Sequence, residues 1–208
     1  MFDRPAQRLY PILDEAVSAA RGSDLLGLAL ACFRGGAQIV QLRVKSAASS
    51  RFLDLASAIS AAAQTFGAAL IVNDRADIAR MARAAGVHVG QDDVPPEAVR
   101  VVFSEGLIGL STHDPRQVDD ALASAADYVA VGPVFATATK ETGYTARGLG
   151  LVSAAAGRGK PVVAIGGIDL DRAPQVLEAG AASVAVITDL LIGGDPEARV
   201  RAYLRALA

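Results

Sequence analysis

Eight short apolar runs, rich in β-branched residues, recur along the chain and alternate with longer segments. Each run is hydrophobic without strict alternation, which is typical of strands that are covered on both faces in a parallel sheet. The runs occupy residues 9–13, 39–43, 69–73, 86–90, 107–111, 128–132, 162–166 and 183–188. The pattern therefore predicts eight parallel β-strands.

The segments between the runs carry helical periodicity, most clearly over residues 49–66. Apolar residues recur there at helical spacing and predict one face that packs on the sheet. These residues are Phe52, Leu55, Ala56, Ile59, Ala63 and Phe66. Helix starts are indicated by Asp114-Pro115 and Asp195-Pro196, because each pair offers a capping carboxylate and a proline suited to the first turn.

The eightfold alternation of strand and helix predicts an α/β protein with a single (β/α)8 TIM barrel. A doubly wound open sheet is the alternative, but eight regular units without a break favour the closed barrel. The 208 residues fit one catalytic domain over residues 1–208, near the lower size limit for this fold. The longest irregular stretch, 136–148, is expected to be a mobile loop of the kind that often forms a lid.

Composition narrows the function classes. Lys and Arg number 20 against 22 for Asp and Glu, so the net charge of −2 provides no basic field for nucleic acid. The single cysteine, Cys32, excludes an intramolecular disulfide framework and is expected to be a buried thiol. Residues 1–8 lack the apolar core of a secretory signal, and no run reaches the roughly 18 apolar residues of a membrane span. We expect a cytoplasmic protein with no nucleic-acid or membrane partner, in which any phosphate binding is local.

Polar residues directly after the apolar runs are the candidates for chemistry, because active sites of this fold form at the carboxyl ends of the strands. After the second run, Gln41, Arg43 and Lys45 alternate with apolar residues and should point to one side. Arg grips phosphate oxygens bidentately and Lys supplies a point charge, so the pair suits a diphosphate. A helix cap or an ion pair at the barrel rim is the alternative interpretation.

Carboxylates follow two neighbouring runs. Asp74 comes after the third run, beside Asn73, and Asp93 comes after the fourth. Two carboxylates that face one another repel unless a cation lies between them, and Mg²⁺ takes one or two protein carboxylates together with waters and phosphate oxygens. The sequence therefore predicts a Mg²⁺ site with Asp74 and Asp93 as ligands. Considered singly, either aspartate could instead cap the helix that follows it.

A second anion site is predicted after the seventh and eighth runs. Gly166 and Gly167 offer bare backbone, which permits an anion to approach amide N–H groups where this fold usually binds phosphate. Leu190 and Leu191 predict an apolar helix whose amino end points at the same anion.

The segment after the sixth run contains two hydroxyls and an ammonium group. Thr137, Thr139 and Lys140 are placed where a loop could close over an anionic substrate. A solvated loop without a binding role is the alternative.

Nucleophilic catalysis is not indicated. Ser111 and His113 follow the fifth run, but no paired acid is evident and the G-x-S-x-G elbow is absent. His88 lies inside the fourth run, where a histidine with satisfied hydrogen bonds in the core is expected more often than a ligand.

The set of motifs, taken in order, resembles the thiamine-phosphate synthase family. The resemblance runs from the first apolar run to the eighth, and the order of the motifs is specific although each is weak alone. The motifs are Gln41-Leu42-Arg43-Val44-Lys45, Asn73-Asp74-Arg75, His88-Val89-Gly90-Gln91-Asp92-Asp93, Gly109-Leu110-Ser111-Thr112-His113, Gly132-Pro133-Val134-Phe135, Thr137-Ala138-Thr139-Lys140 and Ala164-Ile165-Gly166-Gly167-Ile168.

The resemblance implies a role for each candidate residue. Hydroxymethylpyrimidine diphosphate would be bound by Gln41, Arg43, Lys45, Asn73, Ser111 and Lys140, with Mg²⁺ on Asp74 and Asp93. Thiazole phosphate would be bound by Thr137, Thr139, Gly167, Ile187 and Thr188. Within these sets, the catalytic residues would be Lys45, Ser111 and Lys140.

The family reaction joins two small phosphorylated substrates. The resemblance implies that the pyrimidine C–O bond ionises with Mg²⁺ assistance, diphosphate leaves, and the thiazole nitrogen attacks the pyrimidinylmethyl cation to give thiamine phosphate. The alternatives are a thiazole tautomerase of the same family, which would use a histidine such as His113, and a non-catalytic protein that binds thiamine phosphate. The set of Lys45, Asp74, Asp93 and Lys140 favours the synthase. The sequence leaves a homo-oligomer open.

Overall fold

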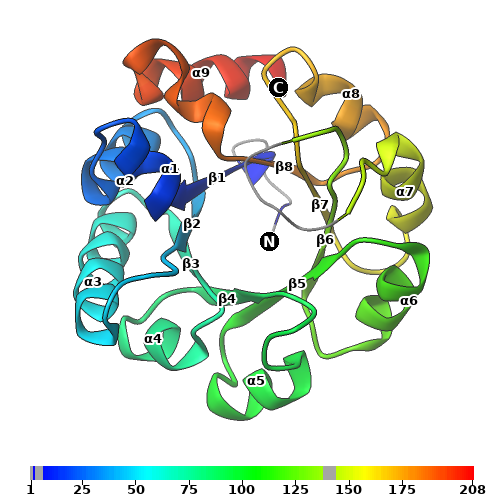
Figure 1. Ribbon diagram of the computed structural model, residues 1–208, viewed down its shortest axis with the longest axis horizontal. Coiled ribbons are helices and arrows are strands. Elements are labelled where there is room, and N and C mark those ends of the chain that lie inside the picture. The colour runs from blue at the N-terminus through cyan, green and yellow to red at the C-terminus, as the bar shows by residue number, and fades with distance from the viewer. Residues whose placement is uncertain (1, 3–6, 138–143) are drawn as a thin grey trace.

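The computed structural model describes residue 2 and residues 7–137 and 144–208. Within these residues, eight parallel strands pair in chain order and the last pairs with the first, which closes the sheet into a barrel (Figure 1). The strands are β1 (Leu9–Asp14), β2 (Ile39–Arg43), β3 (Ala69–Asn73), β4 (Gly86–Val89), β5 (Leu107–Thr112), β6 (Tyr128–Val131), β7 (Val162–Ile165) and β8 (Ser183–Val186). Each strand falls on a predicted run, so the (β/α)8 barrel is confirmed and the open sheet is wrong.

Helices surround the barrel on its outside (Figure 1). They are α1 (Glu15–Ala20), α2 (Leu25–Arg34), α3 (Ser49–Thr65), α4 (Ala76–Met81), α5 (Pro96–Val102), α6 (Pro115–Ala123), α7 (Gly148–Ala155), α8 (Ala173–Glu178), the 3₁₀ helix η2 (Thr188–Gly194) and α9 (Pro196–Ala206). Both predicted caps are confirmed, because the Asp114 and Asp195 carboxylates accept backbone N–H groups of α6 and α9 at 2.9 Å. None of the described helices is long and apolar enough to cross a membrane.

Helix α3 shows how the apolar pattern determines packing. Phe52, Ala56 and Ile59 are buried on its inner face, as their spacing predicts. Phe66 departs from that prediction, since it follows the helix and its side chain is 45% exposed. Its ring instead stacks on Phe33 of α2 with the centroids 5.7 Å apart. The end of α3 turns Phe66 away from the strands, toward the neighbouring helix.

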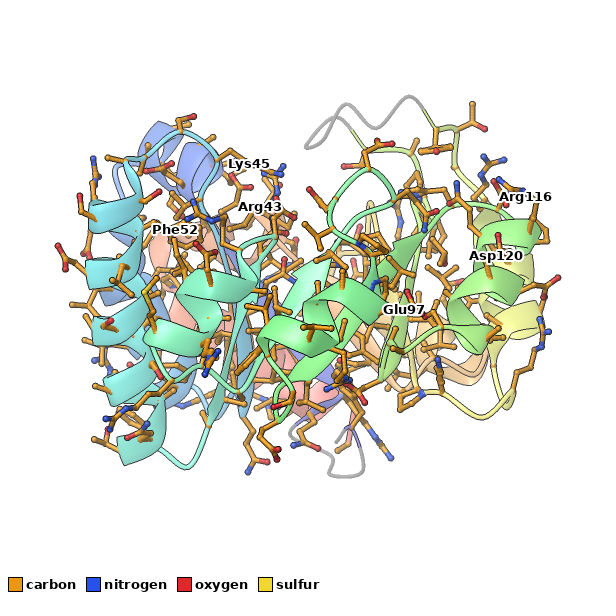
Figure 2. The ribbon with its side chains drawn as sticks, turned by 90° about the horizontal axis from the view of Figure 1, so that it is seen from below. Arg43, Lys45, Phe52, Glu97, Arg116 and Asp120 are labelled. Carbon is orange, nitrogen blue, oxygen red and sulfur yellow. The ribbon has the colours of Figure 1, made fainter. Side chains whose placement is uncertain are left out.

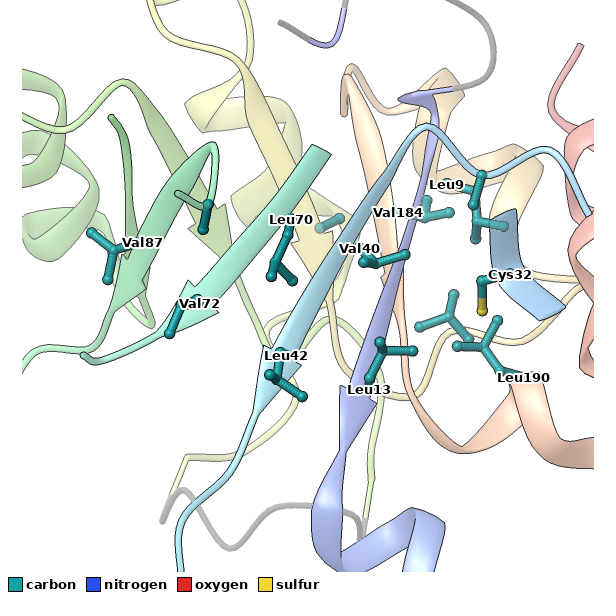
Figure 3. Close-up of a cluster of buried hydrophobic side chains, with 14 of the residues drawn as sticks. Leu9, Leu13, Cys32, Val40, Leu42, Leu70, Val72, Val87, Val184 and Leu190 are labelled. Atoms are coloured by element: carbon teal, nitrogen blue, oxygen red, sulfur yellow. The ribbon is translucent and has the colours of Figure 1, made fainter. Parts of the chain in front are cut away.

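The outward face of the strands forms the main core against the helices. Figure 3 shows Leu13, Val40 and Leu42 of this layer in one cluster with Cys32 of α2. Withdrawing a large aliphatic side chain from water stabilises the fold by about 1.5–3 kcal/mol. Cys32 is buried as predicted, and burial raises the pKa of its thiol to about 12, which keeps the thiol neutral.

The inward face of the strands forms a second core that includes Tyr10, Ile39 and Tyr128. The Phe2 ring also packs here and meets the Tyr128 ring edge-on, with the centroids 5.3 Å apart. Because the strands are parallel, their carboxyl ends meet at one mouth of the barrel. Figure 2 shows Arg43 and Lys45 at the upper rim, where β2 ends. The fold therefore brings residues that follow different strands to one place.

Candidate active site

Two adjoining cavities lie at the carboxyl ends of the strands in the described part of the chain. The first cavity has a volume of about 80 Å³ and the second about 310 Å³. Both are lined by Ser111, Ile165, Ala185 and Ile187. The cavities are therefore neighbours that share a partly apolar boundary.

The first cavity brings together the described residues that were predicted to bind the pyrimidine diphosphate and the metal ion. These residues are Gln41, Arg43, Lys45, Asn73, Asp74, Asp93 and Ser111. The alternation after β2 is confirmed, because Leu42 and Val44 lie in the outer core while their polar neighbours line the cavity. Lys140 lies outside the described residues.

Of the three cations predicted for the first cavity, the two that the structure describes each form an ion pair with a carboxylate. Arg43 pairs with Asp14, whose side chain is only 5% exposed, and Lys45 pairs with Asp74. Sequence reasoning missed Asp14, although it follows the first apolar run directly and also caps α1 by accepting the Val17 N–H at 3.0 Å. The rim ion pair that was considered as an alternative role thus exists, and its members line the cavity.

Asp74 and Asp93 lie side by side at the ends of β3 and β4. Burial raises the pKa of the Asp74 carboxyl, the neighbouring Asp93 carboxyl adds to the rise, and Lys45 opposes it. The helix-capping alternative is wrong for both residues, because Arg75 and Pro95 occupy the cap positions of α4 and α5, and neither of these two helices has a side-chain cap hydrogen bond. Asp93 instead accepts the Gly90 N–H at 2.8 Å.

Asn73 carries an unused hydrogen-bond donor. Its side chain is 7% exposed and lines the first cavity, and its Nδ2 atom has no hydrogen-bond partner among the described residues. A buried donor without a partner costs about 1–3 kcal/mol. An acceptor on a bound ligand would recover that cost.

His88 is a buried residue with both ring nitrogens hydrogen-bonded, as predicted. Its Nε2 atom lies 2.9 Å from Ser111 Oγ, and its Nδ1 atom lies 3.0 Å from the Tyr128 hydroxyl. Because the third group is a phenol and not a carboxylate, the Ser111–His88 pair does not form a Ser-His-Asp triad.

The second cavity contains the described residues that were predicted to bind the thiazole phosphate. They are Thr137, Gly167, Ile187 and Thr188, joined by Gly166, His113 and Asp189. Thr139 lies outside the described residues. The two predicted halves of the site are thus found in two neighbouring cavities.

Close packing requires glycine at the two positions after β7, in addition to the predicted approach of an anion to bare backbone. Gly166 and Gly167 have φ angles of +104° and +63°, which favour glycine. A Cβ atom on Gly166 would lie 2.6 Å from Pro133 Cα, and one on Gly167 would lie 2.6 Å from the Ala136 carbonyl oxygen. The absence of side chains therefore lets the segment after β6 approach the end of β7.

The segment after β8 differs from the predicted apolar helix. Residues 188–194 form a short 3₁₀ helix that is kinked at Ile192 and Gly193, so a macrodipole aimed at the anion is not supported. Its Asp189, missed by sequence reasoning, accepts two hydrogen bonds from Arg199 Nη2 at 2.9 and 2.7 Å and one from the Tyr203 hydroxyl. Side chains of α9 therefore hold this part of the second cavity in place.

His113 lines the second cavity. Its Nδ1 atom lies 2.7 Å from the Gly132 carbonyl oxygen, and its ring stacks on Tyr144 with the centroids 4.1 Å apart. The backbone carbonyl and the aromatic ring fix the orientation of the imidazole.

Comparisons with known proteins find relatives that match most of the chain. A thiamine-phosphate synthase of a Mycobacterium species is 45% identical over 196 residues, which cover 88% of this chain and 86% of the relative. A thiamine-phosphate synthase of Thermosynechococcus vestitus is 42% identical over 191 residues and 91% of this chain, but the chain spans only 54% of that relative. The names of these relatives agree with the activity that the sequence predicts.

A solved structure and a family model also match most of the chain. The thiamine phosphate pyrophosphorylase from Pyrococcus furiosus has a TM-score of 0.89 and 26% identity, and the match covers 98% of this chain and 96% of that one. The model of the thiamine monophosphate synthase family matches residues 9–190. The chain therefore belongs to the thiamine monophosphate synthase family.

Proposed function

We propose that the chain condenses hydroxymethylpyrimidine diphosphate with thiazole phosphate to give thiamine phosphate and diphosphate. The observation that carries this proposal is the pairing of two cavities through a shared boundary. One cavity carries cations and paired carboxylates, and the other lies where this fold usually binds phosphate. Ser111 lines both cavities, so the reacting ends of two substrates would meet beside it.

The diphosphate would lie in the first cavity against Arg43, Lys45 and Asn73. The guanidinium and ammonium groups supply positive charge, and the unused Asn73 N–H supplies a neutral donor. Lys140 would add a second ammonium group. These groups stabilise the charge that develops on the leaving diphosphate more than they stabilise the bound ester, which is the condition for faster ionisation.

The carboxylate pair fits the Mg²⁺ ion that the family implies. Asp74 and Asp93 are neighbours whose mutual repulsion contributes to the raised pKa of Asp74, and their oxygen donors are the kind that Mg²⁺ prefers. Among the described residues, no group of three His, Cys, Asp or Glu side chains could hold a metal ion, so substrate oxygens and waters would complete the ligand set. When bound, the ion would neutralise diphosphate charge. Asp74 and Asp93 would hold it.

The bond changes need no general base. The pyrimidine C–O bond breaks and its electron pair leaves with diphosphate, and the thiazole nitrogen lone pair then forms the new C–N bond. Ile165 and Ala185 line the shared boundary of the cavities and would limit the water available to quench the cation. Charge stabilisation and exclusion of water are thus the main tasks of the protein.

The thiazole phosphate would lie in the second cavity. Thr137 and Thr188 supply hydroxyl groups, and Gly167 and Ile187 line the same space. Thr139 is proposed to add a further hydroxyl. This half of the site would orient the thiazole so that its nitrogen faces the first cavity.

An assay with both substrates and Mg²⁺ tests the proposal by detecting thiamine phosphate and diphosphate. Isomerisation of a thiazole phosphate without diphosphate release would favour the tautomerase. Stoichiometric binding without turnover would favour the non-catalytic binder. The cytoplasmic location stays a prediction of the sequence, which leaves a homo-oligomer open.

A further inference from the structure

A chain of hydrogen bonds crosses the interior of the barrel from Gln41 on β2 to Ser111 on β5. Gln41 Nε2 donates to the Tyr10 hydroxyl at 3.2 Å, and the hydroxyls of Tyr10 and Tyr128 lie 3.0 Å apart. His88 continues the chain, with Nδ1 3.0 Å from the Tyr128 hydroxyl and Nε2 2.9 Å from Ser111 Oγ. The five residues belong to five different strands, so only barrel closure brings them together.

The middle of this chain is tightly packed. Tyr10 and Tyr128 are each 1% exposed, and the His88 ring stacks on the Tyr128 ring with the centroids 5.6 Å apart. Gly109 of β5 leaves the space that these rings fill, because a Cβ atom there would lie 2.1 Å from Tyr128 Cζ and 2.4 Å from His88 Nδ1. The hydrogen-bonded groups therefore have little freedom to move.

The groups in this chain of hydrogen bonds are suited to holding other side chains in position. Burial raises the pKa of the Tyr10 and Tyr128 hydroxyls, so both phenols stay neutral and can donate one hydrogen bond and accept others. A serine hydroxyl rotates freely unless a partner fixes it, and His88 is such a partner for Ser111. The two ends of the chain, Gln41 and Ser111, both line the first cavity.

We propose that His88 and Tyr128 are positioning residues, which hold the Ser111 hydroxyl and, through Tyr10, the Gln41 amide in one arrangement that recognises the pyrimidine ring. This inference rests on the proposed function. An aminopyrimidine presents an amino donor beside a ring-nitrogen acceptor, and a hydroxyl and a primary amide can match both groups. Fixing them before binding lowers the ordering cost of recognition.

The variant Tyr128→Phe tests the proposal, because it keeps the ring and removes the hydroxyl that joins His88 to Tyr10. We expect kcat/KM for the pyrimidine diphosphate to fall about tenfold, as for the loss of buried hydrogen bonds, while KM for the thiazole phosphate changes less than about twofold. Ser60→Ala is the matched control, since the buried Ser60 hydroxyl donates to the Arg83 carbonyl oxygen at 3.0 Å and lines neither cavity, so its kcat/KM for the pyrimidine diphosphate should match that of the wild type. An equal loss for both substrates in Tyr128→Phe would overturn the proposal.

A double-mutant cycle separates positioning from a general structural role. In a Ser111→Ala background, most of the tenfold loss caused by Tyr128→Phe should disappear, because the hydroxyl that it positions is already absent. The same loss in both backgrounds would show that Tyr128 does not act through the Ser111 hydroxyl and would overturn the proposal. If Tyr128→Phe does not unfold cooperatively on heating, Tyr10→Phe replaces it and should weaken use of the pyrimidine substrate, because it removes the hydroxyl that joins Gln41 to Tyr128.

Wild-type turnover distinguishes failure of this inference from failure of the proposed function. Wild-type diphosphate release together with an unchanged pyrimidine kcat/KM in Tyr128→Phe would refute positioning and leave the synthase activity standing. No release by the wild type would refute the proposed function. Titration calorimetry with the pyrimidine diphosphate would then decide the positioning role: weaker binding by Tyr128→Phe supports it, and equal binding refutes it.

Discussion

The Lys45 ammonium group and the Asp74 carboxylate form an ion pair at the mouth of the barrel. Lys45 is a proposed diphosphate ligand and Asp74 a proposed Mg²⁺ ligand, so each neutralises the other before substrate and metal bind. Asp14 stands in the same relation to Arg43. The two ion pairs thus limit the repulsion among like charges in the first cavity, where Asp93 adds a further carboxylate beside Asp74.

Replacing Lys45 should separate metal binding from turnover. In Lys45→Gln, Asp74 loses its competing cation, so we expect Mg²⁺ to bind about two- to fivefold more tightly, a range that allows for solvent screening at the half-exposed lysine. Turnover should fall because the diphosphate loses a cation. Calorimetric titration with Mg²⁺ alone and a steady-state assay measure the two effects. Weaker Mg²⁺ binding would contradict the competition between the lysine and the metal ion.

Asp93→Asn should leave the fold intact and lower kcat by about 100-fold or more, since metal assistance contributes several kcal/mol. The asparagine side chain still offers an oxygen to the Gly90 N–H, which preserves the local turn. Asp92→Asn is the matched control, because Asp92 is exposed and lines neither cavity. Mg²⁺-dependent activity equal to that of the wild type in Asp93→Asn would remove Asp93 from the metal site.

Gly167→Ala should raise the KM for the thiazole phosphate and destabilise the fold by about 1–3 kcal/mol. The positive φ angle strains any side chain, and the new Cβ would press on the Ala136 carbonyl oxygen at the second cavity. Gly157→Ala is the control, since Gly157 also has a positive φ of +72° but a Cβ there would meet no described atom within 4 Å. Thermal unfolding and steady-state kinetics should show a stability loss in both variants and a KM change only in Gly167→Ala. A change confined to the pyrimidine substrate would overturn the division of the site.

Arg199→Gln should disturb the second cavity by removing a contact that supports Asp189. The variant leaves the buried Asp189 carboxylate without its guanidinium partner, so we expect a loss of about 1–3 kcal/mol in unfolding free energy and a higher KM for the thiazole phosphate. Arg201→Gln is the control on the same helix, because its ion pair with Glu197 is exposed to solvent, so its removal should change stability and kinetics little. Denaturant unfolding and kinetics with each substrate varied would test this. Equal losses in the two variants would show that Asp189 has no special need for Arg199.

Local patterns in the sequence determined the elements of this protein and the direction of many side chains. A strand has a period of two residues, so the alternation of Gln41, Leu42 and Arg43 indicates which side chains face inward. The capping carboxylates Asp114 and Asp195 act on N–H groups three residues away, so they too are visible locally. Because the strands are parallel, the polar residues that follow the apolar runs all lie at one mouth of the barrel.

Only the tertiary structure decided which of these side chains meet. The pairing of Arg43 with Asp14 and the chain from Gln41 to Ser111 depend on contacts between different strands and on the register of the closed barrel. A local pattern shows which face of an element is apolar. It does not show which residue of another strand will lie against that face. The same reason explains Phe66, which has the right period for the inner face of α3 but packs on Phe33, because the helix ends before it.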